Sequence, residues 1–560
     1  MPLKNISQQL ETLDEAKQDF SVRGHLRIER LLRILSRATL DSPDELLKYH
    51  ETLLFLRAYP HTAAVLKLTE RELSSFPKRV RELRDAGVDV VGLEHPEVSG
   101  IAGIGLSDSF SYYIVNWLVH HQQGRVFLDE DWVEDENRLP SLLNKLIPLL
   151  SEDASVEANV PFKKWLCAAK PKRVNELRWL LERIASLPKS DAEKAELYNS
   201  STLYVRWEPS YRASRTGLRL PVRRVFYHDE PLIQRKEISL STELRKPPLR
   251  VERLSQPQGR RILDLTRESS TVRYRELYGF THGDERRVLK VDVGRGVQLF
   301  VVGLPPEKRL PLRAYHAAMI FKNGIAVGYF EGLSFFERME SGFNLYYTFR
   351  DGETAWMYAQ TLRLFQQLLG VTVFTLDPYQ IGFENEEGIE SGAFWFYRKL
   401  GFRSTQKLLA ELTAREEKKI ASKRGFRTSA STLRRLAAGY MIYDLDPHPA
   451  SPWDAFQIRN IGFAVAQHMA QKFGGDIEKF RESALAYVGN ALGLKTKSAA
   501  DELLLPIALI PNLDKWSPAE KSQTLKVIRA KTSSDESTYL RAMQRHPRLR
   551  NAMIRLGSKH

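Results

Sequence analysis

A tyrosine within a short aromatic segment is the residue whose type and setting most clearly could do chemistry in this chain. The segment runs from Ser391 to Arg403 as Ser-Gly-Ala-Phe-Trp-Phe-Tyr-Arg-Lys-Leu-Gly-Phe-Arg. Its tyrosine, Tyr397, carries a phenol with an ordinary pKa of about 10, which can act as a general acid. A tyrosine at helical spacing can instead fill a core position, so spacing alone leaves both interpretations open.

The same segment reads as the end of a helix. Apolar residues recur at helical spacing at Ile389, Ala393, Phe396, Tyr397 and Leu400. Gly401 follows where a helix needs a residue that tolerates the left-handed conformation. The pattern therefore predicts an amphipathic helix over residues 386–400 with a glycine stop, after which Phe402 packs back.

This stretch resembles the last helix and following turn of the GNAT superfamily of acyl-CoA N-acyltransferases. The common form in that family is Asn-x-x-Ala-x-x-x-Tyr-x-Lys-x-Gly-Phe. Five positions fall in register, namely Ala393, Tyr397, Lys399, Gly401 and Phe402, whereas Glu390 takes the asparagine's place. The resemblance implies that acetyl-CoA or another acyl-CoA is the donor and that Tyr397 protonates the leaving CoA thiolate.

The resemblance also implies a site for the CoA pyrophosphate. In the family, backbone amides between the fourth strand and the next helix cradle this group at the positive end of the helix dipole. The matching positions here are Arg350, Gly352, Glu353, Thr354 and Ala355. The glycine stands one place early, and Asp351 and Glu353 add negative charge, so a capped turn with Asp351 as N-cap is the alternative.

Acyl transfer to an amine needs a neutral amine and hydrogen-bond donors at the thioester oxygen. The site implied by the resemblance has Glu340 as candidate base, with Glu331 on the preceding strand in reserve. Either glutamate can equally be an ordinary polar residue at a strand edge. Backbone amides along one stretch are expected to supply the donors and contact the cofactor, at Phe343, Asn344, Leu345 and Tyr346.

Other kinds of site leave no pattern in the sequence. We find no spacing typical of metal ligands and no nucleophile elbow, so no metal is expected. Cys167 is the single cysteine, which excludes an intramolecular disulfide and fits a reducing compartment. The N-terminus lacks the apolar core of a signal peptide, and no apolar run reaches the roughly 18 residues of a membrane span. These features predict a cytoplasmic protein without membrane contact.

The formal charge of +15 suggests anionic partners, although 84 basic and 69 acidic residues are spread along the whole chain. Phosphates of CoA would suit this charge, and so would nucleic acid. Arginines and aromatic residues alternate over residues 206–235, a pattern that can bind single-stranded nucleic acid or form a solvated basic linker.

The order of elements over residues 258–447 favours an α+β domain of GNAT type. Ile262–Leu265 is predicted as its first strand and Ser269–Tyr278 as a helix. Further strands are predicted over 288–293, 297–302, 314–321, 325–333, 342–348 and 371–376, with a helix over 352–369. Lys322–Gly324 is predicted as an Asn-Gly hairpin turn. Residues 406–438 are expected to form a basic helical insertion, peripheral to the sheet, before a last strand over 439–445.

The remaining sequence surrounds this domain with mainly α-helical regions. We predict a helical domain at 1–200, a basic proline-rich segment with short strands, Leu203–Trp207 and Arg223–Tyr227, at 201–257, and a helical region at 448–560. The leading function is a transferase that moves an acetyl or acyl group from CoA to an amine of a small molecule or protein. A non-catalytic GNAT-like scaffold for a partner protein and a basic nucleic-acid-binding protein are the alternatives.

Overall fold

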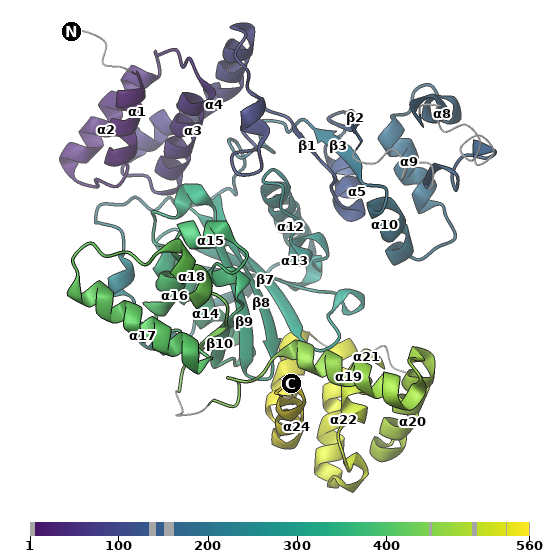
Figure 1. Ribbon diagram of the computed structural model, residues 1–560. Coiled ribbons are helices and arrows are strands. Elements are labelled where there is room, and N and C mark those ends of the chain that lie inside the picture. The colour runs from purple at the N-terminus through teal and green to yellow at the C-terminus, as the bar shows by residue number, and fades with distance from the viewer. Residues whose placement is uncertain are drawn as a thin grey trace. The chain divides into compact units, whose positions relative to one another are not determined.

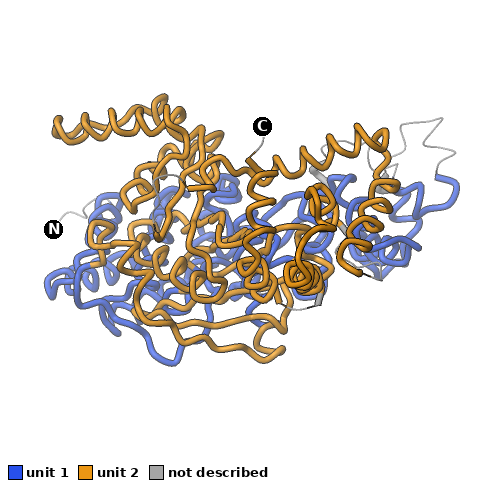
Figure 2. The backbone as a smooth tube through the Cα atoms, turned by 90° about the horizontal axis from the view of Figure 1, so that it is seen from below, with its two compact units in different colours: residues 1–231, 260–281, 322–326 blue, residues 232–259, 282–321, 327–560 orange. Residues whose placement is uncertain are grey.

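The computed structural model describes residues 6–133, 142–150, 162–446, 451–494, 501–533 and 535–558. The chain divides into two compact units, which Figure 2 shows in different colours. Unit 1 comprises residues 1–231, 260–281 and 322–326, and unit 2 comprises residues 232–259, 282–321 and 327–560. Each unit thus gathers segments that lie far apart in the sequence, and the boundaries expected at 200, 257 and 447 stay predictions.

Unit 1 begins with helices whose starts are set by capping residues (Figure 1). These helices are α1 (Ile6–Ala16), α2 (Val22–Leu35), α3 (Pro43–Ala58) and α4 (Ala63–Asp85). The side chains of Ser21, Ser42 and Thr62 each accept a backbone N–H three residues on, which satisfies a donor that the helix itself leaves unpaired.

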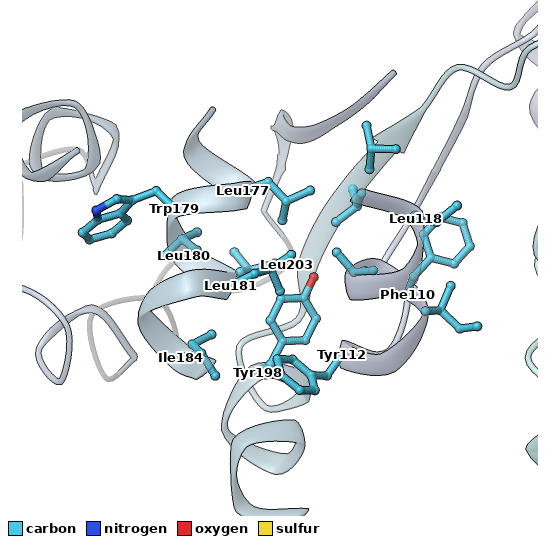
Figure 3. Close-up of a cluster of buried hydrophobic side chains, with 14 of the residues drawn as sticks. Phe110, Tyr112, Leu118, Leu177, Trp179, Leu180, Leu181, Ile184, Tyr198 and Leu203 are labelled. Carbon is cyan, nitrogen blue, oxygen red and sulfur yellow. The ribbon is translucent and has the colours of Figure 1, made fainter. Parts of the chain in front are cut away.

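The rest of unit 1 combines helices with a three-stranded antiparallel sheet of order β1-β3-β2. Its elements are β1 (Leu106–Asp108), α5 (Tyr112–His121), β2 (Val126–Val133), α8 (Phe162–Ala169), α9 (Glu176–Ala185), α10 (Asp191–Asn199) and β3 (Leu203–Trp207). A buried apolar cluster joins α5, α9, α10 and β3 (Figure 3). The predicted strand at 203–207 is confirmed, but the N-terminal 200 residues, expected to be mainly helical, also contribute β1 and β2.

Unit 2 contains most of a mixed nine-stranded sheet of order β11-β12-β10-β9-β8-β7-β6-β5-β4, of which residues 322–326 at the β7–β8 turn are counted in unit 1. Its strands are β4 (Val251–Arg253), β5 (Val288–Gly294), β6 (Val297–Gly303), β7 (Ala314–Lys322), β8 (Ile325–Phe335), β9 (Arg338–Leu345), β10 (Val373–Leu376), β11 (Arg403–Ser404) and β12 (Met441–Asp444). The turn between β7 and β8 has positive φ at Asn323 and Gly324, as a two-residue hairpin requires. The predicted Asn-Gly turn and the strands around it are confirmed.

Helices cover the sheet and continue beyond it. α14 (Thr354–Leu369) packs on the sheet through ring contacts of Phe330 with Phe365 and of Phe343 with Tyr358. The remaining helices of the unit are α11 (Leu240–Leu244), α15 (Glu386–Glu390), α16 (Ala393–Arg398), α17 (Lys407–Ser422), α18 (Ala430–Leu436), α19 (Ile458–Phe473), α20 (Ile477–Leu492), α21 (Asp501–Ala508), α22 (Pro518–Ser533), α23 (Glu536–Gln544) and α24 (Pro547–Gly557). The fold class is therefore mixed α and β, as expected.

The strand predicted at Ile262–Leu265 is wrong, because these residues lie in α12 (Gln256–Thr271). The buried residues of this stretch are Ile262, Leu263, Thr266, Ser269 and Ser270, which recur at helical spacing. Because part of this buried face is serine and threonine, the helical periodicity of apolar residues is not visible in the sequence. The short apolar run at 262–265 resembles a strand instead. The helix predicted at 269–278 is therefore wrong in its bounds, because α12 starts earlier and ends at Thr271, and a brief helix, α13 (Tyr278–Thr281), follows.

Three further expectations change in the structure. The helix predicted over 386–400 is broken into α15 and α16 because Gly392 adopts a left-handed conformation with φ of 68°. A short strand that was not predicted, β11, lies between Phe402 and the insertion expected at 406–438. Arg223–Tyr227 forms no strand, since the amide of Phe226 donates to the side chain of Asn323 instead of to a neighbouring strand.

Candidate functional site

The parallel strands β9 and β10 diverge in the middle of the sheet. They pair from Arg338 opposite Val373 to Glu340 opposite Thr375, and β10 ends one residue later at Leu376. β9 continues along β8 as far as Leu345. The strand predicted at 342–348 therefore starts and ends earlier, and Tyr347–Phe349 forms a 3₁₀ turn. From Ser341 onward, no strand of the described chain pairs with the β10 side of β9.

Side chains take the place of the missing strand partner. The carbonyl of Phe343 accepts a hydrogen bond from Gln380 Nε2 at 2.8 Å, and the carbonyl of Leu345 accepts one from Arg350 Nε at 3.2 Å. Because the N–H and C=O of one strand residue point the same way, the amides of Phe343 and Leu345 also face the gap. Two donors thus line the space where the strands diverge.

The amides of Asn344 and Tyr346, predicted to serve the site together with those of Phe343 and Leu345, point away from the gap. Strand alternation turns their backbone groups toward β8, where the amide of Tyr346 donates to the carbonyl of Val327 at 2.9 Å. Of the four amides expected to serve the site, only those of Phe343 and Leu345 face the gap. Sequence could not separate them because the register of β9 on β8 sets the alternation.

Tyr397 reaches the same gap from α16. Its side chain is 2 % exposed, and its ring contacts those of Tyr358, Phe396 and Phe402. Its hydroxyl accepts a hydrogen bond from Gln380 Nε2 at 2.9 Å. Burial raises the pKa of the Tyr397 hydroxyl well above its ordinary value, which keeps the proton on the phenol at neutral pH.

Gln380 is the residue that sequence reasoning missed. It lies in the turn Tyr379–Ile381 directly after β10, and its carboxamide joins β9 to Tyr397 through the two bonds donated by Nε2. Pro378 precedes this turn, and Gly382 ends it with φ of 117°. A polar residue between Pro and Gly at the carboxyl end of a buried strand was the available signal.

The two candidate glutamates lie in different surroundings. Glu331 stands on β8 directly opposite Gly342 of β9, and it accepts a short hydrogen bond from the hydroxyl of Tyr315. Burial raises the pKa of Glu331, and the Tyr315 bond offsets part of that rise. Glu340 forms ion pairs with Arg313 at 3.2 Å and Arg338 at 3.6 Å. Glu331 is therefore better suited to accept a proton near neutral pH.

The predicted phosphate loop forms the start of α14. Glu353 occupies the N-cap position without a capping side-chain bond, and the first turn of α14 carries no acidic residue. Its carboxylate is instead fully buried against Arg295 at 2.6 Å. The predicted capping role of Asp351 does not occur. The N-cap side chain of α14 therefore makes no capping bond, because its carboxylate pairs with Arg295 instead.

The other members of this loop hold its shape. Thr354 Oγ1 donates to the carbonyl of Arg350 at 2.9 Å, the amide of Gly352 donates to the carbonyl of Phe349 at 3.0 Å, and Ala355 is buried. The guanidinium of Arg350 also pairs with Glu387 of α15. Arg350 therefore links the end of β9 to α15 beside the gap.

Comparisons with known proteins gave no relatives. No family model matches the sequence, and comparison with curated proteins and with solved structures found no match. Within the described ranges, no cluster of three or more His, Cys, Asp or Glu is arranged to hold a metal ion. The helices described include none that is both long and apolar enough to cross a membrane. The candidate function therefore depends on the chain's own residues.

Proposed function

We propose that unit 2 is a GNAT-like N-acyltransferase that moves an acetyl or longer acyl group from CoA to an amine. The observation that carries the proposal is the divergence of β9 and β10 after Glu340 and Thr375, with inward-facing amides on one side and the Tyr397 hydroxyl on the other. The resemblance at residues 390–402 supports the same assignment independently of this geometry.

The residues around the gap suit binding of an acyl-CoA. The start of α14, whose N-cap side chain makes no capping bond, offers the amides of Thr354 and Ala355 to an anion. Arg350, which pairs with Glu387, lies in the same loop. Arg295 neutralises Glu353, so the acidic residue that argued against anion binding in the sequence does not oppose it here. The amides of Phe343 and Leu345 can meet polar groups that follow β9.

The reaction follows from the positions of three groups. Glu331 takes a proton from the acceptor ammonium, and the resulting amine attacks the thioester carbonyl. The amide of Phe343 donates to the thioester oxygen as negative charge develops there. Tyr397 gives its proton to the sulfur as the C–S bond breaks, and the second proton of the attacking nitrogen passes to the Tyr397 phenolate. One C–N bond thus replaces one C–S bond, and the products are an amide, the CoA thiol and the proton held by Glu331.

A thermal shift experiment with the full chain tests the donor assignment. Acetyl-CoA, CoA and longer acyl-CoAs should raise Tm, because a ligand at 100 times its Kd adds about 2.7 kcal/mol to stability. Thr354→Asp places a negative charge at the start of α14, which favours the helix dipole but repels a phosphate. This variant should lose the ligand-induced shift, and its Tm without ligand measures the loss of the hydrogen bond from Thr354 to the Arg350 carbonyl against the gain from the helix dipole.

Ser429→Asp is the matched control, since Ser429 caps the start of another helix, α18. It should leave the ligand-induced shift intact. Absence of any shift with all of these ligands would reject the transferase and favour the non-catalytic scaffold.

A second candidate function is binding to nucleic acid through the insertion formed by α17 and α18. All seven basic residues predicted to be peripheral are exposed, namely Lys418, Lys419, Lys423, Arg424, Arg427, Arg434 and Arg435. Lys419 and Arg434 form ion pairs, whereas no ion pair within the described chain engages the other five. A gel shift with RNA and DNA at several salt concentrations tests this candidate, because phosphate contacts make affinity fall steeply with salt.

A further inference from the structure

A cavity in unit 2 lies apart from the gap between β9 and β10. It measures about 280 Å³ and is lined by residues of β4 to β7, by the end of α14 and by the start of α23. In the sheet, β8 lies between these strands and β9. The start and the end of α14, a helix of 16 residues, are about 24 Å apart. At the packing density of proteins, the cavity can hold on the order of ten non-hydrogen atoms.

Aliphatic side chains make up much of the cavity lining. Val301, Leu304 and Leu369 line it and are each only 1 % exposed. The other aliphatic residues that line it are Val251, Leu289 and Leu368. Because burial of apolar surface drives binding, such a lining favours a ligand that is itself largely apolar.

Three of the four charged residues that line the cavity already have partners. Glu536 pairs with Lys531 at 2.7 Å, Arg287 pairs with Asp284 at 3.1 Å, and Asp535 accepts the amide of Thr538 at 2.9 Å. The fourth, Arg253, is exposed and can be solvated by water. A charged ligand would therefore find no buried counter-charge among the described lining residues, and burying an unpaired charge is costly.

His316 on β7 is the buried polar residue of this lining whose hydrogen bonding is incomplete. It is 9 % exposed, and its Nδ1 is buried without a hydrogen-bond partner in the described part of the chain. Burial lowers the pKa of His316, an effect that Glu536 and Asp535 oppose and that Lys531 and Arg309 strengthen. The imidazole is therefore neutral at neutral pH, with one nitrogen that donates and one that accepts. A buried polar atom without a partner is costly, so Nδ1 indicates a ligand with a hydrogen-bonding group.

We propose that this cavity, which we call the His316 pocket (His316, Val301, Leu304 and Leu369), binds a small uncharged alcohol. The hydroxyl hydrogen-bonds to His316, and the carbon chain packs against the three aliphatic side chains. A hydroxyl both donates and accepts, so it suits either tautomer of the ring. This site is independent of acyl transfer, because it uses neither the gap beside Tyr397 nor the start of α14.

The test uses n-hexanol as probe and n-hexyl fluoride, which has the same number of non-hydrogen atoms but no O–H, as its matched control. Isothermal titration calorimetry of the full chain should show one n-hexanol site with a Kd of about 1 mM or below. Hexanoate and hexylammonium should bind at least about tenfold more weakly. His316→Phe should weaken n-hexanol about tenfold and change the Kd of n-hexyl fluoride by no more than about twofold, because only the alcohol loses a hydrogen bond.

A second variant fills the His316 pocket. Gly303 of β6 also lines the cavity, and a Cβ added there would meet only Arg287, at 3.6 Å and beyond. Gly303→Ile should therefore fold and abolish binding of both n-hexanol and n-hexyl fluoride. Lys290→Ile on β5 is the matched control, because strand alternation turns residue 290 to the other side of the sheet from Leu289. It should leave both Kd values unchanged.

The outcomes decide the assignment whether or not acyl-CoA binds. Absence of n-hexanol binding, or equal weakening of n-hexanol and n-hexyl fluoride by His316→Phe, would overturn the His316 pocket as an alcohol site. Binding of hexanoate or hexylammonium as tight as that of n-hexanol would overturn its preference for an uncharged ligand. If His316→Phe fails to fold, loss of n-hexanol binding in Gly303→Ile supports the location and its persistence overturns it.

Discussion

Two buried tyrosines, one in each unit, show how similar burial can serve different ends. Tyr198 lies in the apolar cluster of unit 1 beside Tyr112, and its buried hydroxyl has no hydrogen-bond partner within the described chain (Figure 3). Tyr397 in unit 2 is equally buried, but its hydroxyl is bonded to Gln380, which also bonds to β9. Burial raises the pKa of both hydroxyls.

The difference lies in the backbone near each ring. Around Tyr198 the neighbouring side chains are mainly apolar, and β3 is paired with a strand on each side, so the ring contributes packing. Beside Tyr397, β9 has no strand partner on one side. Side chains therefore form the hydrogen bonds to the carbonyls of Phe343 and Leu345 that the sheet leaves unpaired. A break in sheet pairing, rather than burial or an altered pKa, therefore marks the position where a ligand can enter.

The largest expected effect is that of Tyr397→Phe. General acid catalysis is typically worth about a hundred- to ten-thousandfold, so turnover with acetyl-CoA should fall at least by the lower figure. Acyl-CoA binding should persist, and stability should change by no more than about 1 kcal/mol. Steady-state kinetics and thermal shifts measure both. Tyr198→Phe is the matched control and should leave turnover unchanged; equal losses in both variants would mean that Tyr397 serves packing alone.

A second kinetic effect concerns the base. Glu331 accepts a proton only when ionised, and burial raises its pKa. The apparent pKa of the acid limb in the pH profile of kcat/KM should therefore lie above the ordinary glutamate value of about 4.3. Glu331→Gln should remove this limb and lower turnover about a hundredfold. Glu340→Gln should keep the limb but cost on the order of 2 kcal/mol, because the buried Arg338 loses its ion partner. A pH profile retained by Glu331→Gln would exclude Glu331 as the base.

Unit 1 should respond to acid through a buried histidine. Burial lowers the pKa of His50 on α3 to about 4, whereas the unfolded value is about 6.5. The unfolded chain therefore binds the extra proton first, and stability present above pH 6.5 is lost as pH falls toward 4, by on the order of 3 kcal/mol. Hydrogen exchange of α3 amides at pH 7 and pH 5 measures the loss. His120→Gln, at an exposed position on α5, should not alter it.

The smallest effect tests the break between α15 and α16. Gly392 has φ of 68°, and a Cβ there would meet nothing within 4 Å, so Gly392→Ala should cost about 1 kcal/mol through backbone strain alone. Gly462 on α19 is equally open but does not have positive φ. Gly462→Ala should stabilise by up to about 1 kcal/mol. Urea unfolding of both variants should thus show opposite signs, and equal signs would contradict the strained conformation.

Local patterns in the sequence predicted much of unit 2. Alternation and the Asn-Gly signal placed β5 to β8, and the glycine at position 401 has the predicted positive φ of 104°. Three features of the site depend on contacts between segments that are distant in sequence. They are the hydrogen bonds of Gln380, the ion pair of Glu353 with Arg295 and the orientation of the β9 amides. Periodicity contains no information on such contacts. The buried face of α12 was not predicted because serines and a threonine make up three of the five residues named for it.

The loop within the basic insertion, between α17 and α18, affects how the chain tolerates proteolysis. Residues 423–429 join α17 to α18 without regular structure, and they expose Lys423, Arg424 and Arg427, after which trypsin cleaves. β12, which follows the insertion, pairs with β11 and β10, which precede it. A nick in this loop would therefore leave two fragments joined through the sheet, and the connection between α17 and α18 is a natural point at which to divide the protein into two complementing halves.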